Sequence, residues 1–404
     1  MSSFLPGLDL RERRVAMAVC GGIAAYKAID VLRILTEAGA EVRVSMTPEA
    51  QRFIRPLTFE ALSDQPVLSD WLEPGAGGEA HIRLSEWAEI LLIVPATANT
   101  IAKLALGLAD EIVSGTALAT RAPLLLAPAM NDVMLVHPRT EEHLTTLRER
   151  GACVVAPAVG RLASGKVGAG RLAAPERIVA AAEAVLQGRR RLEGWRVVIT
   201  AGGTREAIDP VRYLGNFSSG KMGRALAQVA EARGAQVTLI TTLPTGLEGL
   251  NEIAVGSAQE MLAALEQPAR EADAVLMAAA VADYRAAEVA PAKIKRRQER
   301  LELGLVPTAD LLAGLRLRPG ALKVGFAAET EDLIERAREK LRVKRLDLIV
   351  ANPVGLDGQG LGSDFNAATI LDAHRVIAEI PRRSKWEVAQ RIWDAVEAAR
   401  AGSR

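Results

Sequence analysis

Apolar runs of strand length alternate with helix-period stretches along the first half of the chain. Buried strands are predicted by the apolar runs at residues 15–20, 41–46, 90–95, 124–128 and 153–156. Helices are predicted at residues 23–38, 101–109, 139–150 and 175–186. Because strands that alternate with helices pair in parallel, we expect a parallel sheet covered by helices on both faces.

The second half repeats this alternation after a basic run, Arg189-Arg190-Arg191, which we interpret as a solvated linker. Strands are predicted at residues 196–201, 236–241, 274–280, 322–326 and 347–351, and a hairpin at 367–380. Helices are predicted at residues 224–234, 258–272, 308–313, around 336–344, and at 385–400. The sequence therefore predicts an α/β protein with two doubly wound parallel-sheet domains, residues 1–188 and 189–404.

The composition narrows the class of protein. Of 404 residues, 49% are apolar and 25% charged, as in globular domains with sizeable cores. A formal net charge of +1 and an aromatic content of 3% argue against a nucleic acid or a membrane as partner. Cys20 and Cys153 are too few for a disulfide framework or a zinc site. Without a signal-peptide pattern at the N-terminus, we expect a cytoplasmic protein.

A long loop, residues 208–223, joins a predicted strand to a predicted helix in the second half. Loops of this length at such a junction usually carry function. Its last part, Ser218-Ser219-Gly220-Lys221, opens the helix with small residues and a cation, a combination typical of anion sites. The alternative interpretation is a surface loop that has no function and in which Lys221 is merely solvated.

A phosphate-loop nucleotide hydrolase is a second alternative for the same loop. Gly215, Gly220 and Lys221 have the spacing of that motif, but Met222 stands where a hydroxyl should hold magnesium. The stretch Gly202-Gly203-Thr204 also lacks the third glycine of a dinucleotide fingerprint. Neither motif is complete in this sequence.

Small and polar residues follow four predicted strands of the first half. They lie at residues 21–27, 45–47, 95–100 and 128–131. Ligands of parallel sheets bind beyond the carboxyl ends of the strands, so these clusters predict a ligand site. Each cluster taken alone is better explained as a helix cap, but four of them at four strand ends favour a ligand site.

These motifs resemble the signatures of two known protein families. The stretch DPVRYLGNFSSGKMG at 209–223 resembles the signature of phosphopantothenate–cysteine ligases, which in bacteria are fused behind a phosphopantothenoylcysteine decarboxylase. GGIAAYK at 21–27, PATAN at 95–99 and PAMN at 128–131 resemble the flavin-dependent cysteine decarboxylases. The resemblance spans about residues 13–400. It implies a flavodoxin-like, flavin-decarboxylase-type first domain and a Rossmann-like second domain.

For the first domain the resemblance implies bound FMN. The implied FMN contacts are Gly22, Ala24, Ser45, Thr47, Thr97 and Asn99. Asn131 would bind the substrate carboxylate, and His81 would do acid–base work during oxidation of the cysteinyl group. The family has a cysteine where Ser164 stands, in a flap at residues 160–171. In the family, that thiol is the expected proton donor when the ene-thiol intermediate is reduced to product. Ser164 therefore puts this last step of the reaction in question.

For the second domain the resemblance implies a nucleotide site. The implied contacts are Ser218, Ser219, Asp283, Lys293, Ala309, Asp310, Leu311, Leu312, Phe326, Lys340 and Lys344. Arg336, Lys340 and Lys344 also form a stripe at helical spacing, which costs roughly 0.2–0.5 kcal/mol per like-charge pair. A stripe kept at this cost favours an anionic ligand such as a triphosphate over a merely solvated face.

The resemblance thus implies two consecutive steps of coenzyme A biosynthesis. The second domain would use CTP and Mg2+ to activate 4′-phosphopantothenate for attack by cysteine, with Asn216 and Lys293 as catalytic residues. The first domain would decarboxylate the product to 4′-phosphopantetheine. We expect a homo-oligomer that acts on small molecules. The alternatives for the first domain are an impaired or oxidative decarboxylase, or a flavin-binding regulatory module.

Overall fold

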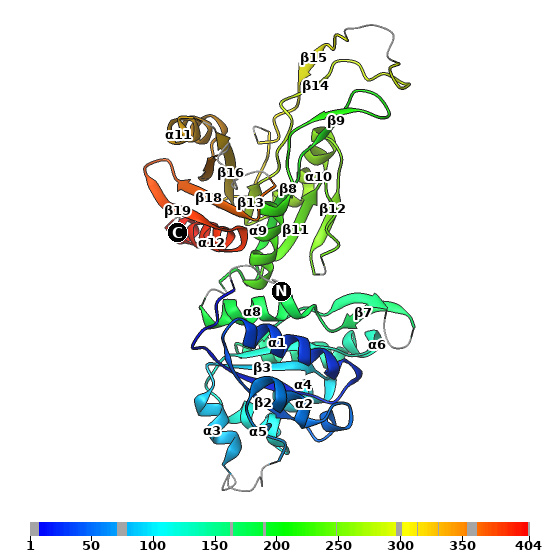
Figure 1. Ribbon diagram of the computed structural model, residues 1–404, viewed down its shortest axis with the longest axis vertical. Helices are drawn as coiled ribbons and strands as arrows, with labels where there is room; N and C mark the ends of the chain where they lie inside the picture. The colour runs from blue at the N-terminus through cyan, green and yellow to red at the C-terminus, as the bar shows by residue number, and fades with distance from the viewer. Residues whose placement is uncertain are drawn as a thin grey trace. The chain divides into compact units, whose positions relative to one another are not determined.

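The computed structural model divides into two compact units, residues 1–190 and 191–404 (Figure 1). It describes residues 8–70, 79–161, 165–188, 191–247, 249–295, 301–312, 314–329, 331–353 and 362–402. Within these ranges, no helix has both the length and the apolar character needed to cross a bilayer. Each unit is built around its own sheet.

The first unit has a five-stranded parallel sheet. Its strands are β1 (Arg14–Val19), β2 (Glu41–Met46), β3 (Ile90–Ala96), β4 (Leu124–Pro128) and β5 (Cys153–Val154). Their order across the sheet is β2-β1-β3-β4-β5, and every neighbouring pair is parallel. This is the flavodoxin-like order, with the strand order reversing between β1 and β3. The predicted fold of this half is confirmed.

Helices cover both faces of this sheet. Successive strand residues point to opposite sides, so an apolar strand presents an apolar surface on each face that a helix can bury. One apolar core joins Val15, Met17 and Val19 to helices α1 (Ala28–Glu37), α2 (Pro56–Ser63) and α8 (Pro175–Leu186). The other joins Ala16 and Ala18 to α3 (Ala80–Trp87), α4 (Ala98–Leu106), α5 (Ile112–Ala119) and α7 (Pro138–Glu149). The remaining elements are η1 (Ile23–Lys27), η2 (Ala50–Arg52), α6 (Asp132–Leu135) and the antiparallel hairpin β6 (Ala158–Arg161) to β7 (Val167–Arg171).

The second unit has an eight-stranded sheet. Its strands are β8 (Arg196–Ala201), β11 (Gln236–Thr241), β12 (Asn251–Ala254), β13 (Ala274–Met277), β16 (Leu322–Glu329), β17 (Leu348–Pro353), β18 (Phe365–Leu371) and β19 (Val376–Ser384). The order is β12-β11-β8-β13-β16-β17-β18-β19. The first six strands are parallel and follow the 3-2-1-4-5-6 order of the Rossmann fold. The predicted hairpin, β18–β19, extends the sheet antiparallel.

Four helices pack on the faces of this second sheet. On one face, α10 (Ala258–Glu271) and α11 (Leu333–Lys344) share an apolar core with alternate strand residues. On the other, α9 (Lys221–Ala232) packs beside α12 (Lys385–Gly402). Trp393 of α12 is fully buried and donates its indole N–H to the Leu226 carbonyl at 2.9 Å. The α9–α12 pair is therefore fixed by both apolar and polar contacts.

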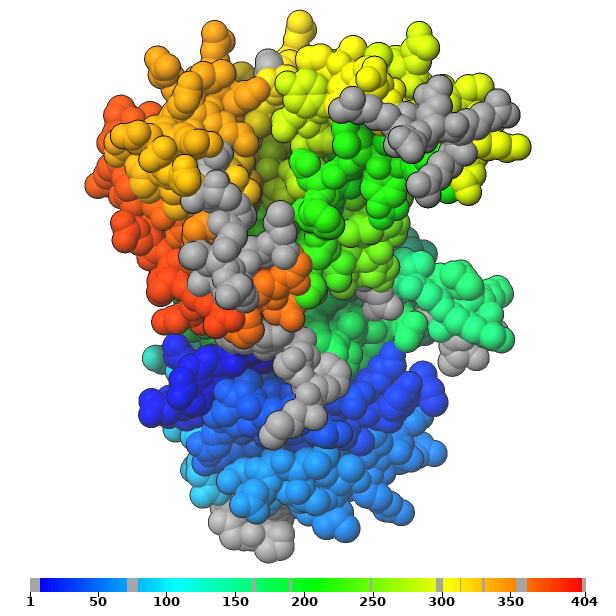
Figure 2. Space-filling view, turned by 45° about the horizontal axis from the view of Figure 1, so that its top comes forward, coloured from blue at the N-terminus to red at the C-terminus, as the bar shows by residue number. Residues whose placement is uncertain are grey.

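Two short hairpins form an arm that extends from the second sheet (Figure 1). They are β9 (Arg205–Ala207) with β10 (Tyr213–Gly215), and β14 (Tyr284–Ala286) with β15 (Leu305–Pro307). In the space-filling view, the yellow surface of the second hairpin lies beside the green surface of the first (Figure 2). The arm carries large exposed apolar side chains, among them Val211, Tyr213 and Phe217.

Three local predictions need correction. Residues 308–312 form no helix: the Thr308 hydroxyl donates to the Ala282 carbonyl at 2.6 Å instead of capping a helix. Residues 23–38 are η1 followed by α1, with a tighter 3-10 turn next to the glycines. The helix predicted at 224–234 starts at Lys221, because Gly220 takes a left-handed conformation that can open it.

Arg233 provides a stability test for the second unit. Its fully buried guanidinium donates to Glu397 at 2.7 Å and lies 2.9 Å from Asp394, both on α12. Arg233→Met should lower the free energy of unfolding by about 3 kcal/mol, because it leaves these carboxylates without their buried partner. Urea unfolding of the full chain, followed by tryptophan fluorescence, measures this. Arg33→Gln, which breaks the exposed Arg33–Glu37 pair, should change it by less than about 1 kcal/mol; equal losses would contradict the argument.

Candidate functional site

A cavity of about 730 Å³ opens where the strand order of the first sheet reverses. Its walls come from the segments that follow β1, β2, β3 and β4, and from β7. At this point neighbouring loops leave toward opposite faces of the sheet, so a gap remains beyond the strand ends. The fold therefore brings the small and polar clusters predicted from the sequence together around one cavity.

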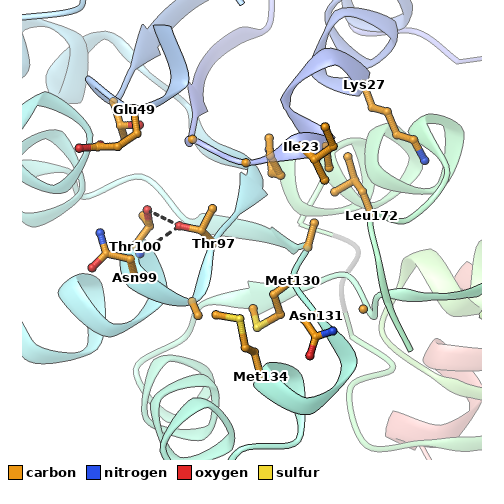
Figure 3. Close-up of a pocket in the computed structure, with 18 of the residues that line it drawn as sticks. Ile23, Lys27, Glu49, Thr97, Asn99, Thr100, Met130, Asn131, Met134 and Leu172 are labelled. Atoms are coloured by element: carbon orange, nitrogen blue, oxygen red, sulfur yellow. Dashed lines mark hydrogen bonds between the residues drawn. The ribbon is translucent and has the colours of Figure 1, made fainter. Parts of the chain in front are cut away.

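The turn after β1 leaves room for an anion. Gly22 precedes η1 in an extended conformation, and no side chain caps the first turn. A Cβ atom at Gly22 would lie 3.6 Å from the Thr97 methyl group, so glycine keeps this gap open. Thr97 caps α4 by accepting the Thr100 amide at 3.3 Å, and the two hydroxyls lie 3.1 Å apart (Figure 3).

Apolar side chains line two further parts of this cavity. Figure 3 shows Met130 and Met134 on one side, and Ile23 and Leu172 on another. Asn131, which accepts the Val133 amide at 3.0 Å, stands beside the methionines. A cavity with an uncapped helical turn at one end and an apolar wall fits a phosphorylated aromatic group such as a flavin mononucleotide.

Cys20 is a buried residue that directly follows β1 and precedes the glycines of the cavity wall. Burial raises the pKa of its thiol to about 12, although a hydrogen bond with Thr100 acts in the opposite direction. The thiol therefore stays protonated at physiological pH and packs in the core that faces α4 and α5. Cys20 is not a nucleophile or proton donor for the cavity.

The structure brings together most of the residues predicted for this site. Gly22, Ala24, Thr47, Thr97, Asn99 and Asn131 line the cavity. Ser45 is fully buried in β2 and His81 lies on α3; neither is among the lining residues. Ser164 lies outside the described residues, between β6 and β7. Met130 stands within the PAMN motif, whereas no sequence pattern marked Met134, an apolar residue in the short helix α6.

A second cavity, about 650 Å³, lies at the strand-order reversal of the second sheet, between β8 and β13. The predicted residues that line it are Asn216, Ser218, Ser219, Asp283, Ala309, Asp310, Leu311, Leu312, Phe326, Lys340 and Lys344. They come from loops, from β16 and from α11, and the outermost of them are more than a hundred residues apart in the chain. The reversal point gathers them for the same topological reason as in the first domain.

Hydrogen bonds between side chains and the backbone hold the wall of the second cavity. The side-chain amide of Asn216 donates to the Val281 carbonyl at 3.0 Å, and the backbone amide of Ala282 donates to the Thr204 hydroxyl at 2.9 Å. A Cβ atom at Gly203 would lie 2.5 Å from the Asn216 carbonyl oxygen, so only glycine allows this approach. The reactive-site asparagine predicted from sequence is thereby held against the segment that follows β13.

The basic stripe of α11 contributes two lysines to the cavity. Lys340 donates to the Phe326 carbonyl at 2.8 Å, and Lys344 forms an ion pair with Asp310. Arg336 is exposed and does not line the cavity. A helical stripe turns gradually around the helix, which is why only part of it faces the cavity.

Lys293 stands apart from this cavity, in an exposed segment next to a buried carboxylate. Asp209 accepts the amides of Val211 and Arg212, each at 2.8 Å, and the Ile294 amide at 3.2 Å. The Arg212 guanidinium donates to Asp209 at 2.9 Å and to the Ile294 carbonyl at 2.5 Å. Asp209 and Arg212 thus fasten the residue that follows Lys293 to the loop 208–212.

Three lining residues of the second cavity were not anticipated: Asn352 at the end of β17, Asn366 in β18 and Lys385 at the start of α12. Nothing in the local sequence distinguishes them, since a lysine before an amphipathic helix and asparagines near strands are common. Lys221, in contrast, was noted within the loop motif and does line the cavity.

Family comparisons agree with the division into two α/β units. Residues 6–187 match the flavoprotein family, and residues 192–399 match the DNA/pantothenate metabolism flavoprotein C-terminal domain family. The fold and the two cavities define a flavodoxin-like flavoprotein domain joined to a Rossmann-like domain, each with a cavity at its strand-order reversal.

Relatives over nearly the full length identify the particular family. The chain is 44% identical over 371 residues to the coenzyme A biosynthesis bifunctional protein CoaBC of Vibrio vulnificus (strain YJ016), covering 89% of this chain and 92% of the relative. It is 44% identical over 399 residues to that of Bacillus subtilis (strain 168), covering 96% and 98%. A solved C-terminal domain of a CoaBC protein is 40% identical over 51% of this chain and 96% of that one, with a TM-score of 0.43. The chain belongs to the family of coenzyme A biosynthesis bifunctional proteins.

Asp209 gives the arm a pH-dependent contribution to stability. Burial raises the pKa of this carboxyl, but hydrogen bonds from Val211, Ile294 and Arg212 outweigh it and lower the pKa to about 2. The contribution is therefore complete above the ordinary pKa near 4 and is lost as the pH falls through about 2. The melting temperature should fall more steeply between pH 5 and pH 2 in the wild type than in Asp209→Asn.

Calorimetric scans of both proteins across this range measure the difference, with Asp30→Asn, at an exposed position of α1, as control. The two curves for wild type and Asp209→Asn should converge near pH 2. Parallel curves over the whole range would contradict the assignment.

Proposed function

We propose that the second domain ligates cysteine to 4′-phosphopantothenate with CTP, and that the first decarboxylates the product with FMN. The observation that carries the ligase assignment is the second cavity. It combines the Ser218-Ser219-Gly220 helix start, two lysines of α11 and the amide of Asn216. Such a set of donors suits a nucleotide triphosphate beside a carboxylate that becomes activated.

In the ligation, the substrate carboxylate attacks the α-phosphorus of CTP and pyrophosphate leaves. The cysteine amine then attacks the acyl carbon, and CMP leaves with the former carboxylate oxygen. Lys340 and Lys344 would neutralise phosphate charge, and Mg2+ would accompany the triphosphate. Asn216 would donate a hydrogen bond to the oxyanion that forms during the second attack, where a fixed donor contributes most.

In the first domain, the uncapped turn at Gly22 would hold the FMN phosphate, and the Met130–Met134 wall would face the ring system. Bound FMN supplies the oxidation that makes loss of CO2 feasible. The side-chain amide of Asn131 would bind the substrate carboxylate without adding a positive charge that holds it ionised. His81 would contribute acid–base chemistry, although it does not line the cavity of a single chain.

One sequence feature favours a second candidate for the first domain. Ser164 stands where the related decarboxylases are expected to have a cysteine, and a serine hydroxyl is a much weaker acid than a thiol. The domain would then decarboxylate slowly, release an oxidised ene-thiol, or serve as a flavin-binding regulatory module. We further propose that the protein acts in the cytoplasm as a homo-oligomer.

The ligase assignment predicts different effects at two residues. Lys293 does not line the second cavity, but the family resemblance implies that Lys293→Gln should abolish formation of the acyl-cytidylate. Asn216→Asp should let it form and accumulate, because a carboxylate cannot donate a hydrogen bond to the oxyanion. Rapid-quench analysis with CTP, Mg2+, phosphopantothenate and cysteine measures both species, and CTP should be preferred to ATP.

Asn251→Asp is the matched control, because this asparagine lies on the edge strand β12, outside the second cavity, where its side chain donates to the Thr238 hydroxyl at 3.2 Å. It should ligate at the wild-type rate. Normal ligation by both Lys293→Gln and Asn216→Asp would refute the site, and CTP hydrolysis without phosphopantothenate would favour a nucleotide hydrolase instead.

The decarboxylase assignment predicts a yellow protein that contains FMN, and a gain of activity in Ser164→Cys. Restoring one general acid typically changes a rate by about 10²–10⁴-fold. Mass analysis of the product from phosphopantothenoylcysteine, with its rate of formation, tests this. A colourless chain that FMN cannot reconstitute would exclude the assignment. Rapid wild-type formation of phosphopantetheine, unchanged in Ser164→Cys, would show that this position does not limit the reaction.

A further inference from the structure

Two lysines from distant parts of the chain meet at one end of the second cavity. Lys221 is the first residue of α9, and Lys385 is the first residue of α12. Both line the cavity, together with Ser218, Ser219 and Gly220. The packing of α9 against α12 brings them together, although 164 positions separate them in the sequence.

Lys385 is the more deeply placed of the two. The residue is only 8% exposed, and its ammonium donates to the Ser363 carbonyl at 2.5 Å. Its backbone is held as well, because its amide donates to the Asp364 carbonyl at 2.9 Å. Ser384 and Glu387 form a reciprocal capping box around it, with bonds of 3.1 and 3.2 Å. The side chain of Lys385 is thus fixed at the cavity wall.

The carboxylates near Lys385 are engaged by other cations. Asp364 is paired with Lys221 at 2.6 Å, and Glu387 lies 3.8 Å from Arg383. Burial, and then the neighbouring charge of Lys221, lower the pKa of Lys385 to about 8, against the opposite effect of Asp364. A lysine kept in this environment is stabilised in its charged form by an anion that enters the cavity.

Asn366 gives an independent sign of a ligand at the same end. It is 4% exposed, lines the cavity, and its side-chain oxygen atom has no hydrogen-bond partner among the described residues. Amide oxygen and nitrogen exchange places by a simple flip, so this group can equally present its donor. A buried amide oxygen without a partner is costly unless a ligand satisfies the group.

We propose that Lys385 completes a binding subsite for a phosphate group, together with Lys221, Asn366 and the first-turn amides of α9. Gly220 has no side chain to cap these amides, so they can donate to the anion. The inference deepens the proposed ligase function, whose substrates offer two sources of this chemistry. One is the polyphosphate of CTP, released as pyrophosphate, and the other is the phosphate of phosphopantothenate.

Calorimetric titration of the full chain at pH 8 tests the subsite with three probes, namely inorganic pyrophosphate, CTP and phosphopantothenate. Lys385→Gln should weaken at least one of them by about 10–100-fold, the loss typical of a charge-assisted hydrogen bond. Weakened pyrophosphate and CTP binding assigns the subsite to the polyphosphate. Weakened phosphopantothenate binding alone assigns it to that substrate. Unchanged affinity for all three overturns the proposal.

Proton uptake distinguishes a ligand-binding lysine from a structural one. An anion that raises the pKa of Lys385 draws a proton from the buffer, so the wild-type binding enthalpy should vary with the ionisation enthalpy of the buffer. Lys385→Arg should bind the probe but take up no proton, because a guanidinium is always charged. Identical proton uptake in wild type and Lys385→Arg overturns the proposal. This comparison remains a valid test even if Lys385→Gln fails to fold.

Arg383→Gln is the matched control. It removes one positive charge two residues away, from a side chain that is 55% exposed and pairs with Glu387 outside the cavity. Its affinities and proton uptake should equal those of the wild type. Equal losses in Arg383→Gln and Lys385→Gln would show a general charge effect and overturn the subsite. If the wild type binds pyrophosphate through Lys385 but neither CTP nor phosphopantothenate, the ligase function fails while the subsite stands.

Discussion

The reversal of strand order in each parallel sheet is the constraint on which both cavities depend. At this point the connections that follow two adjacent strands depart toward opposite faces, so neither covers the gap beyond the strand ends. In the first domain the gap lies between β1 and β3, and in the second between β8 and β13. Glycines at Gly22, Gly203 and Gly220 then let backbone amides and carbonyls line these gaps closely.

The two cavities differ in the chemistry that the surrounding elements supply. The first has a wall of methionine, isoleucine and leucine side chains, which suits a flat aromatic ring, beside charged residues of both signs such as Lys27, Glu49 and Arg171. The second is bordered by lysines from α9, α11 and α12, whose charge is only partly offset by Asp310 and Asp364. One topology thus shapes a cavity suited to an aromatic group in one domain and a cavity suited to a polyanion in the other.

The arm of the second domain shows how a buried charge can organise a loop. Asp209 lies at the centre of hydrogen bonds from two segments that are about 80 residues apart, and Arg212 joins both. This arrangement sets where the segment with Lys293 begins, while Lys293 itself remains exposed. The contacts of Asp209 are structural, yet they fix the base of a segment that the family resemblance marks as functional.

The sequence by itself determined the α/β class, most helices and the strands of the two large sheets except β12, because burial imposes runs and periodicities that are local in the chain. It did not predict the short hairpins β6–β7, β9–β10 and β14–β15. It also marked Asn216, Thr97 and Lys340, since they stand in recognisable motifs. Only the tertiary structure decided that Lys385 and Asn366 join the loop at Ser218, that His81 lies away from the first cavity, and that Thr308 bonds to Ala282 instead of capping a helix. These outcomes depend on contacts between segments far apart in sequence, and no local pattern records which distant partner a side chain will meet.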